Sequence, residues 1–121
     1  MEHHTFVIPV YNRSPYLESC VQSLVAQTVK SKIIITTPTP SVYTESIAQK
    51  YAIPYIINNT GNTHVSNSWN FALSNADTQL VTLAHQDDIY EPNYADTIIK
   101  AFDKAKFQLL LTWVLPVLFI I

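Results

Sequence analysis

Glycine is nearly absent from this chain, since Gly61 is the only one in 121 residues. A GxGxxG dinucleotide turn and a GxxxxGK[ST] phosphate loop each need several glycines, because the backbone must approach the phosphates closely. Both motifs are therefore excluded. A nucleotide bound here would need another way to neutralise its phosphates, and a bridging divalent cation would meet that need.

Cysteine and basic residues are also scarce. Cys20 is the only cysteine, which excludes an internal disulfide and allows a reducing compartment. It lies in an apolar stripe at helical spacing, so a buried structural thiol is favoured over a nucleophile. Seven basic residues against nine acidic ones give a net charge of −2. This balance provides no basic patch for nucleic acid or for an anionic membrane surface.

The N-terminus lacks the positive and apolar regions of a signal peptide. His3 and His4 are interpreted as a frayed polar end, with an adventitious metal pair as the alternative. The length allows one domain at most. We expect it to occupy residues 1–106.

Long apolar runs are missing until the last part of the chain, where residues 107–121 are almost wholly apolar. This run is shorter than the roughly 20 residues of a membrane-spanning helix, and Pro116 would kink a helix. We expect a buried strand over Gln108–Leu115 and a truncation point within this tail. The alternative is a surface for peripheral membrane association, a partner or self-association.

Apolar runs alternate with helical periodicity along the chain, a pattern typical of an α/β fold with a mostly parallel sheet flanked by helices. Near-continuous apolar cores such as Ile33-Ile34-Ile35 indicate strands covered on both faces. The expected strands are Thr5–Val10, Lys32–Thr36, Tyr55–Asn58, Gln79–Ala84 and Gln108–Leu115. The expected helices start at Ser14-Pro15, with Ser14 as N-cap, span Tyr43–Tyr51 and Val65–Ala76, and start again near Pro92.

Two adjacent carboxylates, Asp87 and Asp88, directly follow the apolar strand that ends at Ala84. Carboxylates at such a position are costly to desolvate without a positive partner. A divalent cation held by two carboxylates keeps positions open for phosphate oxygens. The simpler alternative is a solvated acidic turn before the helix at Pro92. In open α/β sheets ligands bind beyond the carboxyl ends of strands, and the turn after the first strand ends there too.

The ordered motifs resemble family 2 glycosyltransferases, whose nucleotide-sugar domain has the GT-A fold. The segment Ile8-Pro9-Val10-Tyr11-Asn12 is similar to the family's first motif, and Gly61 through Asn70-Phe71-Ala72-Leu73 looks like its middle element. His85-Gln86-Asp87-Asp88 looks like its acidic metal motif. The resemblance covers roughly residues 5 to 106.

The resemblance implies an inverting, metal-assisted transfer of a sugar from a nucleotide-diphosphate donor to a hydroxyl of a glycan or lipid-linked acceptor. It also implies a role in cell-surface polysaccharide biosynthesis. The expected location is the cytoplasm. Peripheral association would place the chain at the inner face of a membrane. The alternative is a non-catalytic nucleotide-binding remnant, or an α/β module that associates with a membrane or partner.

The same resemblance assigns roles to individual residues. Pro9, Val10 and Tyr11 would line the nucleotide base, with Asn12 near it. Asp87 would face the ribose or the metal, and Asp88 would coordinate Mg²⁺ or Mn²⁺. The remaining nucleotide-binding candidates are Thr37 and Asn70.

Several positions depart from the family pattern. Where the family holds the base with aspartates, this chain has Thr36 to Ser41, so Thr37 offers one hydroxyl and no carboxylate. His85 replaces the first acidic residue, as a metal ligand or a locally bonded side chain. Trp69 replaces an arginine and is interpreted as core, and Arg13 is either a phosphate contact or an exposed loop residue.

A catalytic base is not evident after Asp88. General-base catalysis needs a group within hydrogen-bond reach of the acceptor hydroxyl, and the later carboxylates are Glu91, Asp96 and Asp103. None follows a strand in the way the acidic motif does. We therefore expect the base to lie beyond Ile121, and donor binding without turnover by this chain alone.

Overall fold

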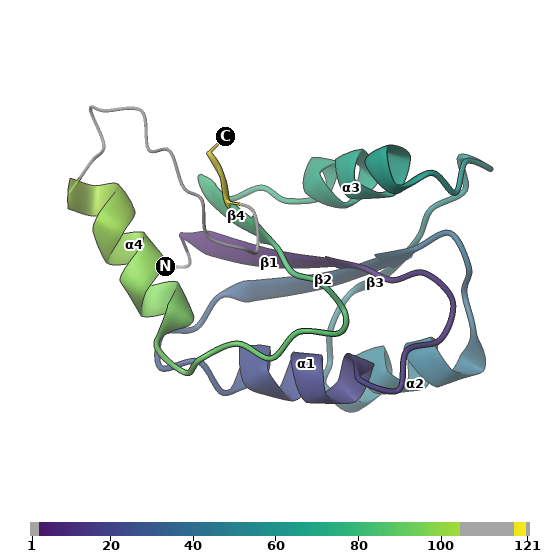
Figure 1. Ribbon diagram of the computed structural model, residues 1–121, viewed down its shortest axis with the longest axis horizontal. Coiled ribbons are helices and arrows are strands. Elements are labelled where there is room, and N and C mark those ends of the chain that lie inside the picture. Colours follow the sequence, from purple (N-terminus) through teal and green to yellow (C-terminus); the bar gives the residue numbers. More distant parts are fainter. Residues whose placement is uncertain (1–2, 105–117, 121) are drawn as a thin grey trace.

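The computed structural model describes residues 3–104 and the strand at 118–120, and shows a sheet covered by helices on both faces (Figure 1). Within these residues the sheet has five strands in the order β3-β2-β1-β4-β5. The strands are β1 (His4–Pro9), β2 (Lys32–Thr37), β3 (Tyr55–Ile57), β4 (Leu80–Leu83) and β5 (Leu118–Ile120). The first four are mutually parallel, which confirms the expected mostly parallel sheet.

β5 pairs antiparallel with β4, with Val81 opposite Phe119. The expected strand over Gln108–Leu115 lies outside the described residues. The sequence pattern did not indicate a strand at Leu118–Ile120, because three apolar residues in a longer apolar run carry no periodic signal.

The helices are α1 (Leu17–Val25), α2 (Val42–Lys50), α3 (Val65–Ser74) and α4 (Tyr94–Lys104). In Figure 1, α1 and α2 lie below the sheet and α3 lies above it. None of the helices in the described residues is long and apolar enough to cross a membrane.

Alternate residues of β1 divide the core into two layers, as expected when successive side chains point to opposite faces. Phe6 and Ile8 of β1, together with Val10 directly after it, pack in the layer that contains α1 and α2. Val7 packs in the other layer, with Ala72 of α3. Burial of both faces explains the continuous apolar runs of the strands.

The structure corrects the prediction for His4. This residue starts β1 opposite Leu80 and is fully buried, whereas only His3 is exposed. Its Nδ1 lies 2.8 Å from Ser31 Oγ and its Nε2 lies 2.6 Å from Thr82 Oγ1. Burial lowers the pKa of the His4 imidazole to about 4. The strand pairing with β4 extends one residue further than the apolar pattern suggests, and this pairing buries the ring.

Two helix predictions also need correction. Helix α1 begins at Leu17, with Tyr16 as N-cap and no side-chain cap, rather than at Ser14-Pro15. The Ser14 hydroxyl instead bonds to Asp87 and to the Tyr16 amide. The helix expected over Val65–Ala76 is α3, which begins at Val65 but ends at Ser74, and Val65 itself is 63% exposed beside the loop after β1.

Candidate functional site

The carboxyl ends of β1, β2 and β4 meet at one edge of the sheet. The ladder continues past the strands, since Val10 N donates to Thr36 O at 2.8 Å and Ala84 N donates to Val7 O at 2.8 Å. The turn after β1 and the acidic turn after β4 therefore lie side by side. Gln86 Nε2 donates to the Tyr11 carbonyl oxygen at 3.3 Å, and the Ser14 hydroxyl donates to Asp87 Oδ1. The expected meeting of the two motifs is confirmed.

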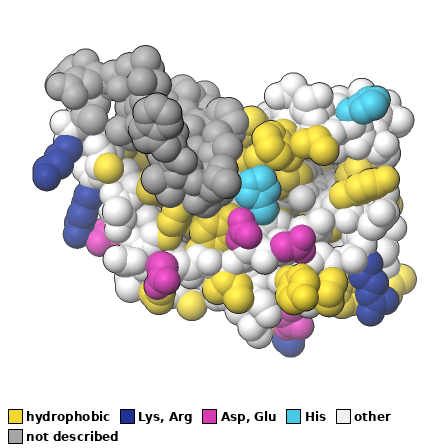
Figure 2. All heavy atoms as spheres, in the orientation of Figure 1, with side chains coloured by type: hydrophobic (Ala, Val, Ile, Leu, Met, Phe, Trp, Pro, Cys, Tyr) yellow, Lys and Arg dark blue, Asp and Glu magenta, His cyan; other side chains and the backbone are white. Residues whose placement is uncertain are grey.

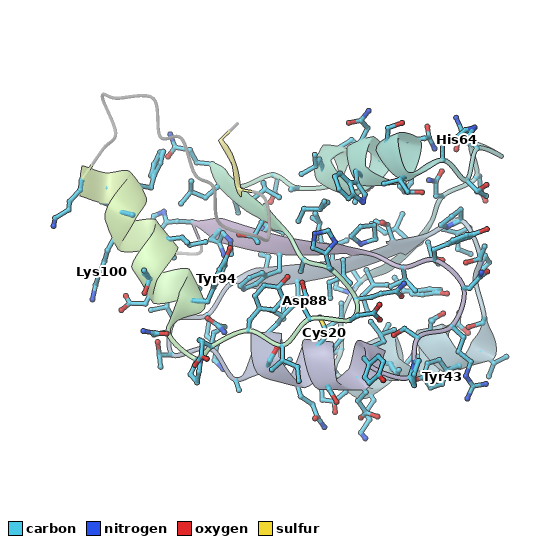
Figure 3. All side chains as sticks on the ribbon, in the orientation of Figure 1. Cys20, Tyr43, His64, Asp88, Tyr94 and Lys100 are labelled. Carbon is cyan, nitrogen blue, oxygen red and sulfur yellow. The ribbon has the colours of Figure 1, made fainter. Side chains whose placement is uncertain are left out.

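Hydrogen bonds from the protein core fix the backbone of the acidic turn. Asp88 N donates to His85 O at 3.1 Å, which closes the turn. His85 N donates to the Tyr90 hydroxyl at 3.1 Å, and the Cys20 thiol donates to the His85 carbonyl oxygen at 3.4 Å. Asp87 and Asp88 remain exposed. Figure 3 shows Asp88 on the loop after β4, near Cys20 of α1.

Cys20 is a buried structural thiol, as expected. Burial raises its pKa to about 12, and the negative charges of Asp88 and Asp87 act in the same direction. A thiol with such a pKa stays protonated at neutral pH and keeps donating to the turn. Burial likewise raises the pKa of the Tyr90 phenol, which remains an acceptor for His85 N–H.

The carboxylates fit a cation that is shared with a ligand, and they do not form a complete protein cage. The described residues contain no group of three or more His, Cys, Asp or Glu side chains that could hold a metal ion. One Asp87 oxygen accepts from Ser14, which leaves its second oxygen and the exposed Asp88 carboxylate as hard donors. Mg²⁺ commonly uses one or two carboxylates and completes its shell with water and phosphate oxygens.

His85 and Trp69 pack together beside this turn. Their ring centroids are 5.7 Å apart in an edge-on arrangement. Trp69 is half-buried against the core layer of α3, consistent with its interpretation as a core residue. Figure 2 shows acidic side chains and a histidine near the centre of the displayed face, bordered by hydrophobic side chains.

Pro9, Val10 and Tyr11 line a small pocket of about 70 Å³ against the start of α3. Its opposite wall comes from the loop before α3 and the first turns of that helix: Thr63, Val65, Ser68 and Trp69. Asn70 is exposed on α3 and does not line this pocket. Of the nucleotide-binding candidates, Pro9, Val10 and Tyr11 thus line one pocket, and Asn70 lies outside its lining.

In the loop after β2, where the family has aspartates, Thr37 and Thr39 form hydrogen bonds with the backbone. Asn12 adopts a left-handed backbone conformation with φ of 57°, which Asn tolerates better than most residues. Its N–H donates to Thr39 Oγ1 at 2.6 Å, and Thr39 N–H donates to Thr37 Oγ1 at 3.0 Å. The Thr37 side chain is fully buried, with its hydroxyl engaged inside the protein. Its expected role as a ligand contact has no support in this geometry.

The Arg13 side chain packs on Tyr43 of α2. Its guanidinium carbon is 4.2 Å from the centroid of the Tyr43 ring, a cation–π contact that connects the loop after β1 to α2. The Tyr43 hydroxyl donates to the Ser14 carbonyl oxygen at 3.1 Å. These contacts fix the loop from which the Ser14 hydroxyl reaches Asp87.

Two buried amides at this edge were missed as site residues. Among the described residues, Asn58 Nδ2 and Gln86 Oε1 are the buried side-chain atoms without a hydrogen-bond partner. Such a group costs about 1–3 kcal/mol, so each calls for an explanation such as a ligand. Asn58 directly follows β3 and Gln86 follows β4 within the acidic motif. The sequence signal for Gln86 was its place in the acidic motif, whereas Asn58 was expected as the last residue of a strand and follows β3 instead.

The chain is an open, mostly parallel α/β sheet with an acidic turn at its carboxyl edge, the edge where ligands bind in this class of fold. The family model of glycosyl transferase family 2 matches residues 5–116. The chain therefore belongs to glycosyl transferase family 2, which confirms the resemblance seen in its motifs.

Curated relatives carry the same description. The chain is 30% identical over 102 residues to glycosyltransferase GlyA of Streptococcus pneumoniae serotype 4, covering 79% of this chain and 14% of that protein. It is 29% identical over 103 residues to an uncharacterized glycosyltransferase of Rickettsia typhi, covering 83% of this chain and 32% of the relative. The chain thus spans a third or less of the length of these relatives.

Solved structures share the fold. Residues 1–349 of S. aureus TarS superpose with a TM-score of 0.77 at 18% identity, over 88% of this chain and 33% of that TarS fragment. TarS has also been solved in complex with UDP-GlcNAc. The mannosyltransferase PcManGT from Pyrobaculum calidifontis, solved with GDP-Man and Mn²⁺, gives a TM-score of 0.69 at 17% identity, over 83% of this chain and 32% of PcManGT. The fold is therefore that of the GT-A glycosyltransferases.

Proposed function

We propose that this chain forms the donor-binding part of a metal-assisted, inverting glycosyltransferase. The contact between the two motifs supports this proposal most strongly, because the Ser14 hydroxyl bonds to Asp87 and joins the loop of the hydrophobic pocket to the acidic turn. The small pocket lined by Pro9, Val10 and Tyr11 would receive part of the nucleoside, and the exposed carboxylates of Asp87 and Asp88 would face the diphosphate.

The residues of the acidic turn would hold Mg²⁺ or Mn²⁺ through the free oxygen of Asp87 and the carboxylate of Asp88. A bound divalent cation neutralises charge on a departing nucleoside diphosphate. The protein contributes a fixed turn, since its backbone is bonded to Cys20 and Tyr90 before any ligand arrives. Such preorganisation avoids part of the ordering cost of binding.

The side-chain amides of Gln86 and Asn58, each with one unpaired buried atom, support recognition of the nucleoside by uncharged groups. Gln86 Oε1 can accept from a ligand hydroxyl, and Asn58 Nδ2 can donate to a ligand oxygen or ring nitrogen. With Thr37 and Thr39 bonded to the protein backbone, these amides take over the polar contacts that the family's aspartates would make. Binding of the nucleoside portion then needs no carboxylate.

Turnover is not part of the function proposed for this chain. The carboxylates Glu91 and Asp103 are exposed, and Asp96 is paired with Lys100 at 2.9 Å on α4. None of them joins the acidic turn through a hydrogen bond in the described residues. The catalytic base belongs to a part of the transferase that this chain does not supply.

Binding titrations test the proposal directly. UDP and GDP are the first probes, since they are the nucleoside diphosphates of donor sugars bound by the structural relatives, and ADP serves as the comparison. In the presence of Mn²⁺ we expect saturable binding of UDP or GDP, and no transfer or hydrolysis of the corresponding nucleotide sugar. Equal, non-saturable binding of all three nucleotides would contradict the proposal.

Replacing Gln86 by methionine should separate ligand recognition from stability. The change removes a buried acceptor without a partner, which favours the folded chain, and also removes the hydrogen bond from Gln86 Nε2 to the Tyr11 carbonyl oxygen. Because these two effects oppose each other, the unfolding free energy should change by less than about 1 kcal/mol. The affinity for uridine, which has no phosphate, should fall about fivefold because one ligand hydrogen bond is lost. Calorimetric titration and urea unfolding measure the two effects. Gln49→Met, at an exposed position of α2, is the control, and unchanged uridine affinity in Gln86→Met would rule out the contact.

A further inference from the structure

Ser14 is a buried residue in an otherwise exposed turn. It is 6% exposed, whereas both Arg13 and Pro15 beside it are exposed. Four hydrogen bonds hold it in place. Its carbonyl oxygen accepts from the Tyr43 hydroxyl at 3.1 Å and from Leu17 N–H at 3.4 Å, and its own hydroxyl contacts the Tyr16 N–H and Asp87. A serine that only needed to cap α1 would not require this burial, and α1 begins three residues later without a side-chain cap.

The direction of the Ser14 hydroxyl proton follows from these contacts. A serine hydroxyl has one proton to donate and can accept at its lone pairs. Tyr16 N–H donates to Ser14 Oγ at 3.1 Å, so this contact uses a lone pair of the oxygen. The single proton is left for Asp87 Oδ1, which lies 73 positions away in the sequence. The hydroxyl therefore donates to one carboxylate oxygen and not to the backbone.

The two carboxylates of the acidic turn differ in this respect. Asp87 is held through one oxygen, whereas no side chain in residues 3–104 donates a hydrogen bond to the Asp88 carboxylate. A hydrogen bond to an ionised group is among the stronger ones in proteins. It limits the rotation of Asp87 and leaves its second oxygen for a ligand.

We propose that Ser14 is a positioning residue for Asp87, one that orients the carboxylate so that its second oxygen meets the cation–diphosphate group of the donor. This inference rests on the proposed function of the acidic turn. It extends that function to a residue outside the motifs, whose spacing from Asp87 gives no sign of a contact. Ser14 acts through Asp87 and does not itself contact the donor.

The first test compares Ser14→Ala with the unchanged chain. The affinity for UDP or GDP, whichever binds, should fall about tenfold in the presence of Mn²⁺, the effect of losing one hydrogen bond to a charged group. The affinity in EDTA should stay the same, because Ser14 acts only on the cation-dependent contact. Ser19→Ala, at an exposed serine of α1, is the matched control and should bind as the unchanged chain does in both conditions.

A double-mutant cycle separates positioning from a merely structural role. In the Asp87→Ala background, Ser14→Ala should have no further effect on Mn²⁺-dependent affinity. Ser14→Thr keeps a hydroxyl and should restore most of the affinity. Because Ser14→Ala also removes the Tyr16 contact, the unfolding midpoint of each variant is measured, and binding is compared well below it.

The outcomes distinguish this inference from the proposed function. If Asp87→Ala weakens Mn²⁺-dependent binding but Ser14→Ala does not, the inference is overturned and the proposed function stands. An equal loss on Ser14→Ala in both backgrounds, or an equal loss with and without Mn²⁺, indicates a structural role and also overturns it. If Asp87→Ala itself has no effect, the assignment of the acidic turn fails, and the inference fails with it.

Discussion

Replacing Asp87 and Asp88 together by alanine is expected to abolish Mn²⁺-dependent nucleotide binding. Both carboxylates lie on a turn fixed by Cys20 and Tyr90, and both remain exposed to a ligand. Replacing residues that only hydrogen-bond to metal ligands typically lowers the affinity for the metal by roughly 10- to 100-fold. Loss of the ligands themselves should therefore lower the affinity in Mn²⁺ by on the order of a hundredfold, to the value found in EDTA.

The control for this experiment removes the same charge elsewhere. Asp77→Ala combined with Asp103→Ala deletes two exposed carboxylates, one just before β4 and one on α4, both near the amino ends of the strands. This variant should bind nucleotide as the unchanged chain does. Calorimetric titration with and without Mn²⁺ measures both variants, and an unchanged affinity of the Asp87/Asp88 variant would sink the site assignment.

The free energy of unfolding is expected to fall by about 3 kcal/mol as the pH drops from about 6.5 to about 4, because the pKa of His4 differs between the unfolded and the folded chain. Its pKa in the folded protein is about 4, against 6.5 for the free side chain. Between these values the unfolded chain binds a proton that the folded chain does not. The contribution is therefore fully present above about pH 6.5, decreases as the pH falls, and is lost below about pH 4, at about 1.4 kcal/mol for each pKa unit.

The surroundings of His4 explain why it resists protonation. The ring nitrogens meet the hydroxyls of Ser31 and Thr82, and the ring packs edge-on against Phe6 at 4.5 Å. No carboxylate is among these contacts to stabilise the imidazolium. Desolvation therefore dominates the shift.

Urea unfolding at about pH 7 and about pH 4.5 measures this effect in the unchanged chain and in His4→Gln. Exposed carboxylates also add to acid sensitivity, because Lys50 lowers the pKa of Glu18 and Lys32 lowers that of Asp77. The difference between the two chains isolates the contribution of His4. Ile47→Val, a core change, should lower stability by about 1 kcal/mol at both pH values. An equal pH dependence in His4→Gln would refute the prediction.

The architecture could be predicted because its signals are local. Apolar runs in β1, β2 and β4 and the stripe Leu17, Cys20, Val21 and Leu24 of α1 match the observed burial. His4 and Ser14 could not be predicted in this way. Their environments depend on partners far along the chain, Thr82 for one and Asp87 for the other. A polar residue at a strand start or before a helix has the same sequence pattern whether it is frayed, capping or buried.

The sequence predicted where the candidate site lies better than it predicted which residues form it. The rule that ligands bind at the carboxyl edge correctly brought the turn after β1 beside the acidic turn. It could not reveal that the hydroxyls of Thr37 and Thr39 accept from backbone N–H groups, or that Gln86 and Asn58 keep partnerless amide atoms. Hydrogen-bond satisfaction depends on the packed geometry, which residue type and spacing do not determine.

The most direct test of the account is the affinity of this chain for UDP and for GDP, measured by calorimetry in Mn²⁺ and in EDTA. The account predicts saturable binding of at least one of them that strengthens at least tenfold in Mn²⁺, since the phosphates are held through the cation and no glycine-rich loop is present to hold them instead. Binding of equal strength in both conditions, or no binding of either nucleotide, would contradict it.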